Sequence, residues 1–403
     1  MRIAKISLHT SPYAVLGTGD GGGMNVVVRS QAEALAGLGH QVDLYTRRSD
    51  PDQPEVEETV PGVRLHHLPA GPPKPLPKSR IDEHLAEFAT ALAERGTPAD
   101  VVHSHHWMSG VAALPVAHAW GVPHLQSYHS VAAVRADDPL SEGEPPESPR
   151  RVPGEVLVAR ESDVVVAISR AEAETIVGRC GADPDRVVVV PPGVDTELFR
   201  PLAPGEEHWQ CCEMRRPYLF FAARLQPLKG PDLALETLAR IDPEHRPHLV
   251  LAGDVSADFA NYHDHVQRMA HRLGIANDVV YSGARPRDEF AAMMRGAEVV
   301  LMPSHSETFG LVALETAASG VPIVASAAGG LREAVADGRT GILMETRDPG
   351  AWGAAVQGLL TDRDTRARMG AEARSWSRRF DWTKVATRLT DIYADSRRKV
   401  SAR

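Results

Sequence analysis

The chain has 403 residues, of which 43% are hydrophobic and 24% charged, a composition typical of globular proteins and a length that favours two domains. Its net charge of -9 argues against a nucleic-acid-binding protein. No apolar run reaches the roughly 18 residues that span a bilayer, and the N-terminus lacks a signal-peptide pattern, so we expect a cytoplasmic protein without stable membrane anchoring.

Short runs rich in β-branched and aromatic residues alternate with amphipathic stretches along the chain. This alternation is typical of a parallel sheet with helices on its faces, so we predict an α/β fold. The predicted strands are Arg2–His9, Gln41–Thr46, Val101–His103, Leu125–Tyr128, Val164–Ile168, Val187–Val190, Tyr218–Phe221, His248–Ala252, Val279–Tyr281, Val299–Met302 and Ile323–Ala325. The predicted helices include Met24–Leu38, Ile81–Ala93, Asp232–Leu238, Tyr262–Leu273 and Ala351–Leu360.

The alternation restarts after a Pro-Pro-Gly segment at residues 191–193. A polar stretch follows, and Tyr218 begins a new run of strands. We therefore predict an N-terminal domain of residues 1–193 and a C-terminal domain of residues 194–382. Two Pro-rich segments of the first domain, Pro61–Pro77 and Asp137–Pro153, are predicted to be surface loops.

Three consecutive glycines, Gly21 to Gly23, precede Met24 and Asn25 at the start of the first predicted helix. Glycine lets the backbone approach a ligand closely, and a helix N-terminus offers free N–H groups to an anion. The segment is not the Gly-x-Gly-x-x-Gly of dinucleotide-binding folds and lacks the acidic residue that follows it there, which disfavours NAD. A glycine turn without a ligand is the alternative interpretation.

Two basic residues, Arg224 and Lys229, follow the predicted strand Tyr218–Phe221. Ligands of parallel sheets bind beyond the carboxyl ends of the strands. Two cations there suit a diphosphate, on which negative charge grows as a leaving group departs. A solvated basic pair is the alternative.

Two glutamates eight positions apart, Glu307 and Glu315, flank the residues Phe309, Gly310 and Leu311. The backbone amides of these three residues open a predicted short helix and could hold a phosphate. The two carboxylates could bind sugar hydroxyls. Glutamates that are simply exposed to solvent are the alternative.

Four histidines lie in or just after predicted strands: His103, His105, His106 and His129. His129 follows the end of a strand and is therefore expected at the cleft. Three interpretations stay open for the group, namely substrate contact, a packed structural role and a metal site. The metal site is disfavoured, because no carboxylate stands at a supporting spacing.

In this order the motifs resemble the retaining GT-B glycosyltransferases of family 4 over nearly the whole chain. The elements that carry the likeness are Gly22-Gly23, His129, Val190–Asp195, Arg224 with Lys229, and Glu307 to Glu315 with Phe-Gly between them. Phe380-Asp381-Trp382 and the helix after it also resemble the family's C-terminal segment, which implies that residues 383–403 pack back on the N-terminal domain. The implied fold is two Rossmann-like domains whose parallel sheets face each other across a cleft.

The resemblance implies a sugar-nucleotide-dependent hexosyltransferase that needs no metal and no cofactor, since the nucleotide sugar is a substrate. Arg224 and Lys229 would bind the donor diphosphate, Glu315 the ribose and Glu307 the sugar. His129 would contact the sugar near its reacting carbon, so the implied catalytic residues are His129, Arg224, Lys229 and Glu307. The implied donor-binding residues are Gly23, Arg224, Lys229, Arg285, Glu307, Phe309, Gly310, Leu311 and Glu315.

Within the family, the likeness is greatest to members that transfer N-acetylglucosamine from UDP-N-acetylglucosamine to inositol phosphate in the mycothiol pathway. The implied acceptor-binding residues are Asn25, Lys78, His106, Ser130 and Arg150, with Lys78 and Arg150 on the acceptor phosphate. His106 stands where those members carry a tyrosine, so an aminocyclitol acceptor of an antibiotic pathway, with another nucleotide sugar as donor, stays open. A sugar-nucleotide 2-epimerase, which needs no acceptor, is the alternative of another class. The expected partners are small-molecule donor and acceptor and no nucleic acid, and the likeness suggests a homodimer.

Overall fold

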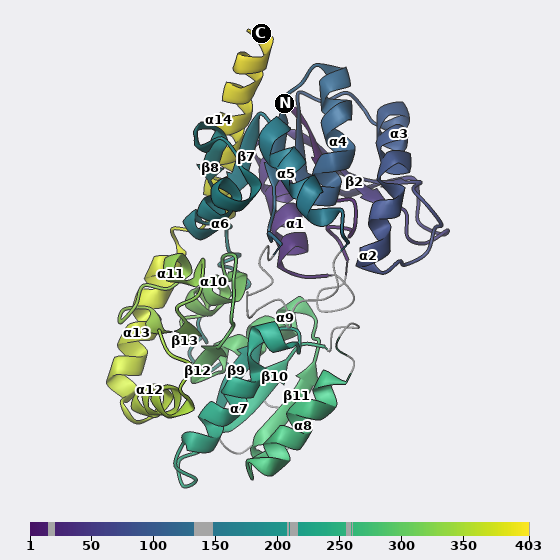
Figure 1. The fold of residues 1–403 in the computed structure, drawn as a ribbon. Coiled ribbons are helices and arrows are strands. Elements are labelled where there is room, and N and C mark those ends of the chain that lie inside the picture. Colours follow the sequence, from purple (N-terminus) through teal and green to yellow (C-terminus); the bar gives the residue numbers. More distant parts are fainter. Residues whose placement is uncertain are drawn as a thin grey trace.

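The computed structural model describes residues 1–14, 21–132, 148–207, 209, 217–254, 259 and 261–402. Two α/β domains lie one above the other, each with a central sheet and helices on its faces (Figure 1). The predicted α/β architecture of two Rossmann-like units is therefore confirmed. Within the described ranges, no helix has both the length and the apolar composition needed to cross a bilayer.

The first domain contains an eight-stranded sheet with the order β3-β4-β2-β1-β5-β6-β7-β8. Neighbouring strands are parallel except β3 and β4, which are antiparallel. Strands covered on both faces are apolar along their length rather than alternating, which is why they stand out in the sequence. The strands are β1 (Arg2–Ile6), β2 (Gln41–Arg47), β3 (Val56–Val60), β4 (Val63–Leu68), β5 (Val101–His105), β6 (His124–Ser127), β7 (Val164–Ala167) and β8 (Val187–Val189).

Helices cover both faces of this sheet. On one face α1 (Gly23–Gly37) packs beside the C-terminal helix α14 (Trp382–Ser401), and Leu35 and Leu389 share one apolar core with the strands. The remaining helices of the domain are α2 (Lys78–Ile81), η1 (Asp82–His84), α3 (Leu85–Arg95), α4 (Trp107–Trp120), α5 (Arg151–Glu161), α6 (Arg170–Thr175), η3 (Ile176–Cys180) and η4 (Pro184–Arg186). Of these, α3 and α4 bury their apolar side chains against the opposite face of the sheet.

The second domain contains a six-stranded parallel sheet with the order β11-β10-β9-β12-β13-β14. Its strands are β9 (Tyr218–Ala222), β10 (His248–Ala252), β11 (Val279–Gly283), β12 (Val299–Met302), β13 (Ile323–Ser326) and β14 (Gly341–Met344). Two apolar clusters, one on each face, join it to its helices. These helices are η5 (Pro227–Lys229), α7 (Pro231–Arg240), α8 (Tyr262–Arg272), η7 (Ala276–Asp278), α9 (Arg287–Arg295), α10 (Leu311–Ala318), α11 (Leu331–Ala334), α12 (Pro349–Thr361) and α13 (Arg363–Ser377).

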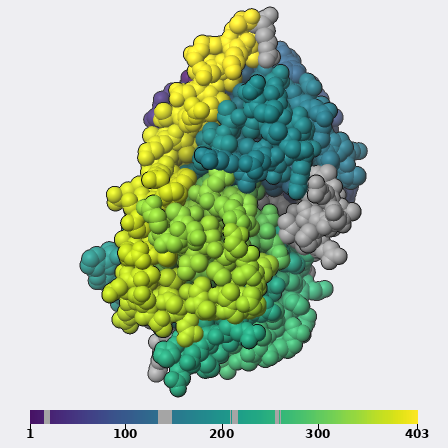
Figure 2. All heavy atoms as spheres, turned by 60° about the vertical axis from the view of Figure 1, so that its left-hand side comes forward, coloured from purple at the N-terminus to yellow at the C-terminus, as the bar shows by residue number. Residues whose placement is uncertain are grey.

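The chain passes between the domains twice, and the two crossings are paired. The amide of Val194 donates a hydrogen bond of 2.7 Å to the carbonyl of Phe380, and Val194 forms a parallel bridge with Asp381. The C-terminal segment then continues from the second domain along the side of the first (Figure 2). The domain boundary that we place at residue 193 stays a prediction.

The structure corrects two loop predictions. Pro61–Pro77 is not a loop throughout, because β4 occupies Val63–Leu68. The sequence did not indicate this strand, because prolines surround it and Arg64 and His66 interrupt its apolar pattern. In the structure the side chains of Arg64 and His66 bond to the carboxylate of Asp43 on the neighbouring strand β2, which satisfies their polar atoms. Residues 133–147 of the second segment lie outside the described ranges, and its last three residues form the first turn of α5, where a proline costs no backbone hydrogen bond.

The long helices α4 and α13 were not among the helices named from the sequence. Helix α4 is apolar on almost every side, and most of its side chains are buried. A helix buried all round shows no polar face and therefore no amphipathic period in the sequence. The predicted strands are present in the structure, although the first ends at Ile6 rather than His9.

Candidate functional site

A pocket of about 260 Å³ lies at the carboxyl ends of β9, β10, β11 and β12, opposite the start of α1. It brings together most of the predicted donor-binding residues. The predicted residues in its lining are Gly23, Arg224, Lys229, Arg285, Glu307, Leu311 and Glu315. The structure thus places side chains that are up to about three hundred positions apart around one hollow, where the strand-end rule for parallel sheets expects a ligand.

The N-termini of two helices lie at this pocket. Helix α1 begins at Gly23, and α10 begins directly after Gly310, whose φ of 94° favours glycine. A Cβ atom on Gly310 would lie 2.5 Å from Leu331, so the turn also has no room for a larger residue. Phe309 is buried in the core, and neither Phe309 nor Gly310 is among the residues that line the pocket, so their predicted contact with the donor stays a prediction. Two helix N-termini facing one hollow make an environment that favours phosphate oxygens.

An ion pair joins the two predicted loops of the second domain. Nζ of Lys229 lies 2.6 Å from Oε1 of Glu307, and Oγ of Ser304 donates a 3.0 Å hydrogen bond to the same oxygen. The side chains of Lys229 and Glu307 are 21% and 12% exposed, so both still reach the pocket. Gly230 has a φ of 69°, and a Cβ atom there would meet the carbonyl of Pro303 at 2.2 Å. This close approach of the two loops is what brings Lys229 to Glu307.

Two glycines that we did not predict hold the Glu307 turn in place. The amide of Gly330 donates to the carbonyl of Glu307 at 2.9 Å. A Cβ atom on Gly330 would lie 2.2 Å from the carbonyl of Thr308, and one on Gly329 would lie 2.3 Å from that of Glu307. The signal in the sequence was the Gly-Gly pair after β13, which marks a close approach of backbone to backbone.

Glu315 is a buried carboxylate at the edge of the same pocket. It is 1% exposed, and Oε1 accepts a hydrogen bond from Nη2 of Arg287. Burial raises the pKa of the Glu315 carboxyl, and the Arg287 charge opposes that rise. Arg285 also lines the pocket, and its Nε donates to the carbonyl of Ser282 at 2.8 Å. Arg287 was not among the predicted residues, although it lies next to Glu315 and lines the pocket.

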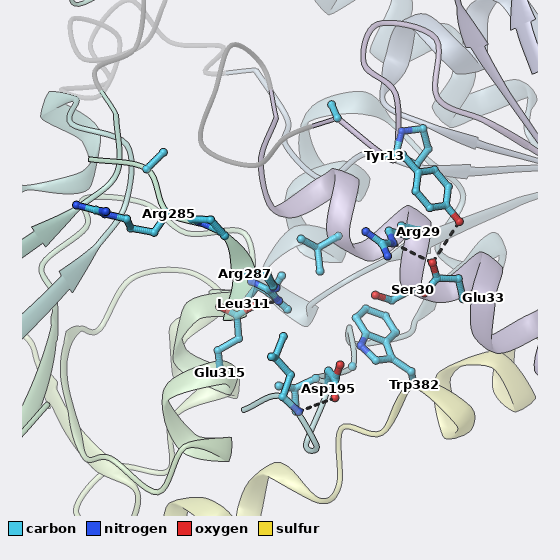
Figure 3. A pocket seen from close by; sticks show the side chains of 18 of the residues that line it. Tyr13, Arg29, Ser30, Glu33, Asp195, Arg285, Arg287, Leu311, Glu315 and Trp382 are labelled. Carbon is cyan, nitrogen blue, oxygen red and sulfur yellow. Dashed lines mark hydrogen bonds and ion pairs between the residues drawn. The ribbon is translucent and has the colours of Figure 1, made fainter. Parts of the chain in front are cut away.

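A second hollow of about 620 Å³ adjoins the first and runs between the domains to the crossing segments. Figure 3 shows Arg285, Arg287 and Glu315 on the wall formed by the second domain. Arg29 and Glu33 of α1 lie on the opposite wall and are joined by a 2.8 Å ion pair. The first pocket therefore opens into a wider cleft lined by both domains.

His129 stands in a backbone conformation that few residues other than glycine adopt. Its φ is 63°, and it follows β6 by two residues. Burial, with a smaller contribution from the Lys5 charge, lowers the pKa of His129 to about 3, so the ring is neutral at physiological pH. Its Nε2 lies 2.8 Å from Nδ1 of His105. Strained backbone of this kind concentrates at functional sites, and a neutral imidazole held by a second one can offer a hydrogen bond of fixed direction.

Two basic side chains, Lys78 and Arg151, lie near the buried ring of His106, and the three residues form what we call the cationic corner of the first domain. The φ of His106 is 72°, the residue is 3% exposed, and neither ring nitrogen has a hydrogen-bond partner within the described ranges. The ring centroid lies 4.3 Å from that of His9. Burial, followed by the nearby charges of His9, Lys78 and Arg151, holds the pKa of His106 well below its usual range. Buried polar atoms of this kind normally have a partner, so the corner suits an anionic or hydroxylated ligand.

Two neighbouring arginines differ in where they point. Nη2 of Arg151 donates to Oγ of Ser130 at 3.1 Å, whereas the predicted residue, Arg150, is 65% exposed and donates to the carbonyl of Asp82 at 3.3 Å. Nε of Arg151 also lies 2.7 Å from Glu155. The structure therefore brings Arg151, and not Arg150, to Ser130. A role of Arg150 in acceptor binding stays a prediction.

Asn25 has a clear structural task. Its amide nitrogen donates to Oγ1 of Thr10 and to the carbonyl of Ser11, and its Oδ1 accepts from the amide of Gly22. These bonds use the hydrogen-bonding capacity of the side chain and shape the loop before α1. Contact of Asn25 with an acceptor stays a prediction. No metal-binding group of three histidine, cysteine or acidic residues occurs in the parts of the chain that the structure describes.

Two family models match the chain. The one described as Glycosyl transferase 4-like domain matches residues 22–193, and the one described as Glycosyl transferases group 1 matches residues 212–376. The D-inositol 3-phosphate glycosyltransferase of Stackebrandtia nassauensis is 41% identical over 100% of this chain and 94% of its own length. The enzyme of the same name from Xylanimonas cellulosilytica is 40% identical over 100% of this chain and 98% of its own length.

Solved structures share the fold. Sucrose-phosphate synthase from Thermosynechococcus elongatus superposes with a TM-score of 0.86 at 28% identity over 98% of each chain. HepE of Anabaena in complex with UDP-glucose superposes with a TM-score of 0.74 over 98% of this chain and 100% of its own, and at 18% identity it supports the fold alone. The predicted GT-B arrangement of two Rossmann-like domains is confirmed by these likenesses and by the two parallel sheets.

Proposed function

This chain belongs to the GT4-type glycosyltransferases, and from that membership we propose that it transfers N-acetylglucosamine from UDP-N-acetylglucosamine to a hydroxyl of an inositol phosphate with retention of configuration. The relatives named D-inositol 3-phosphate glycosyltransferase support the acceptor, since they match this chain over its full length at about 40% identity. The observation that carries the proposal is the cationic corner of the first domain, where Lys78 and Arg151 lie near His106.

The donor pocket supports a nucleoside diphosphate sugar. Lys229 and Arg224 line it together with the N-termini of α1 and α10, and these four positive elements suit a diphosphate. Glu307 is held between Lys229 and Ser304 and would accept hydrogen bonds from the sugar. Glu315 would bind the ribose hydroxyls.

The acceptor corner supports an anionic cyclitol. Lys78 and Arg151 both act on the electrostatics of His106, and Arg151 bonds to Ser130. An uncharged or amine-bearing acceptor would not need two cations in a partly desolvated corner, whereas a phosphate would be stabilised by them. We therefore favour inositol phosphate over an aminocyclitol.

The proposed chemistry needs no nucleophile from the protein. The acceptor hydroxyl attacks the anomeric carbon on the face from which UDP departs, the bond to the β-phosphate oxygen breaks, and that phosphate accepts the hydroxyl proton. Lys229, Arg224 and the two helix N-termini stabilise the negative charge that grows on the departing diphosphate. His129, neutral and held by His105, would contact the sugar near the reacting carbon. Positioning and charge stabilisation then provide most of the rate acceleration.

The experiment is a transfer assay with UDP-N-acetylglucosamine and mass detection of product. The acceptors are D-inositol 3-phosphate, inositol and 2-deoxystreptamine, and UDP-glucose serves as the alternative donor. Product with the phosphorylated acceptor alone supports the proposal. Product only with an uncharged or aminated cyclitol would mean that the acceptor is not phosphorylated. Conversion of the donor, without any acceptor, into a UDP-sugar of equal mass that separates by chromatography would indicate the epimerase reaction instead.

A further inference from the structure

The carboxylate of Glu315 is engaged at one oxygen. Oε1 accepts the hydrogen bond from Nη2 of Arg287, and the side chain is 2% exposed. Within the described ranges, Oε2 has no hydrogen-bond partner. A carboxylate removed from water is costly unless a cation compensates its charge and hydrogen bonds satisfy its oxygens. Glu315 therefore has its cation and one unused acceptor oxygen at the pocket edge.

Arg287 is held in this position from two sides. It is the first residue of α9, and its guanidinium lies 4.6 Å from the ring centroid of Phe199 while it bonds to Glu315. The side chain is 31% exposed and lines both the donor pocket and the wider cleft beside it (Figure 3). The aromatic ring and the carboxylate together restrict the arginine to one orientation.

Two other arginines near the pocket, Arg285 and Arg29, are engaged elsewhere. Arg285 donates to the carbonyl of Ser282 and pairs with Glu289 at 3.4 Å. Arg29, across the cleft, pairs with Glu33 and lies over the ring of Tyr13. Arg287 is the cation that forms an ion pair with Glu315 in the described structure.

We propose that Arg287 is a positioning residue that fixes the Glu315 carboxylate so that its second oxygen accepts hydrogen bonds from the ribose hydroxyls of the donor nucleotide. This inference rests on the proposed function, because it needs a nucleoside diphosphate donor in the pocket. A ribose diol carries no charge and cannot neutralise a buried carboxylate, so the ion pair has to persist when the nucleotide binds. Arg287 then contributes to nucleotide affinity through Glu315, and its effect depends on the presence of the ribose hydroxyls.

The test is a binding cycle measured by isothermal titration calorimetry. UDP and 2′,3′-dideoxy-UDP are titrated into the wild-type protein, Arg287→Met, Glu315→Gln and the double variant. We expect wild type to prefer UDP by about tenfold or more, since a hydrogen bond to a charged group is stronger than a neutral one. Arg287→Met should lose about tenfold in UDP affinity and change dideoxy-UDP affinity by less than about threefold. The double variant should bind UDP no more weakly than the weaker single variant, because the two residues act as one unit.

Two controls separate this effect from lost stability. Arg366→Met removes an ion pair of 2.7 Å with Glu298, which lies at the amino end of β12 and away from the pocket, and should leave both affinities unchanged. Arg287→Lys keeps the charge and should recover part of the preference for UDP. If Arg287→Met does not fold, Arg287→Lys replaces it in the same binding cycle. Its loss of affinity should then be larger for UDP than for dideoxy-UDP.

The outcomes distinguish the inference from the proposed function. Equal losses for UDP and dideoxy-UDP, or losses that add in the double variant, would show that Arg287 contacts the base or the phosphates directly and would overturn the inference alone. A wild-type protein that binds neither UDP nor ADP nor GDP would overturn the proposed donor class and the inference with it. If another nucleotide binds more tightly than UDP, its dideoxy form takes the place of dideoxy-UDP.

Discussion

The Nζ atom of Lys229, on the loop after β9, lies 2.6 Å from the Oε1 atom of Glu307, on the loop after β12. The two loops belong to adjacent strands of one sheet, so the ion pair closes the wall of the donor pocket. A cation and a carboxylate so placed can act on a phosphate and on the sugar attached to it. The first two predictions test this division of tasks.

Lys229→Ala should lower kcat/KM for transfer by about a hundredfold or more, because a preorganised charge on the departing diphosphate is removed. The measurement is steady-state transfer with saturating acceptor. Lys399→Ala, on the exposed last turn of α14, is the matched control and should behave as wild type. A loss of less than about threefold for Lys229→Ala would remove this lysine from the diphosphate site.

Glu307→Gln should reduce transfer far more than it reduces binding of UDP, since the carboxylate is assigned to the sugar. The amide also weakens the contact with Lys229, but Lys229 itself remains at the pocket. We therefore expect the UDP affinity to change by only a few-fold. Calorimetric titration of UDP beside the transfer assay gives the comparison. If both quantities fall by the same factor, Glu307 acts on the nucleotide instead.

Arg151→Met should raise the KM for D-inositol 3-phosphate by about tenfold or more and leave the KM for the donor nearly unchanged. Arg150→Met is the matched neighbour and should raise the acceptor KM by less than about threefold, because its side chain points to solvent. Arg151 also pairs with the buried Glu155, so thermal unfolding of each variant must be recorded. The reverse order of effects would restore Arg150 as the phosphate ligand.

Stability should depend on pH through Lys5, which is fully buried and donates to Oε1 of Gln31 at 2.8 Å. Burial lowers the pKa of Lys5 from 10.5 to about 7. Between these values the unfolded chain binds a proton that the folded chain does not, so the Lys5 contribution to the unfolding free energy rises with pH, by at most about 1.4 kcal/mol per unit. Below pH 7 both states are protonated, and the contribution is constant.

Lys5→Met tests this sign directly. Its unfolding free energy minus that of wild type, from urea titrations at pH 7, 8 and 9, should decrease as the pH rises. Parallel curves for the two proteins would mean that Lys5 keeps its proton throughout and that its charge is compensated in the fold.

The sequence could predict the elements of the site that depend on local pattern. Glu307 and Glu315 stand at a strand end and on the following helix, so their place at the cleft follows from the strand-end rule. Arg287 could not be found in this way, because its role depends on a contact with a residue 28 positions away on another helix. Arg150 and Arg151 were indistinguishable in sequence, and only the direction of the first turn of α5 separates them.

The fold likewise contains elements that local pattern predicts and elements that depend on distant contacts. Strands covered on both faces were predictable from continuous apolar runs, whereas β4 was hidden by its polar side chains, which find partners on β2. The helix α4 was hidden because it is buried all round. In each case the missing information lay in a neighbour that is distant in sequence.

The helix that crosses back from the second domain has a consequence for synthesis of the chain. Leu389 belongs to the apolar cluster beneath the first sheet, and the hydroxyl of Tyr393 lies 2.8 Å from Nδ1 of His103, so the N-terminal domain lacks part of its interior until α14 has left the ribosome. Domains usually fold in the order in which they are made. Here the first domain cannot complete its core until α14 has been made, and until then the apolar side of α1 lacks its partner helix. Among the described residues, the core of the second domain contains none from α14 and can therefore be completed earlier.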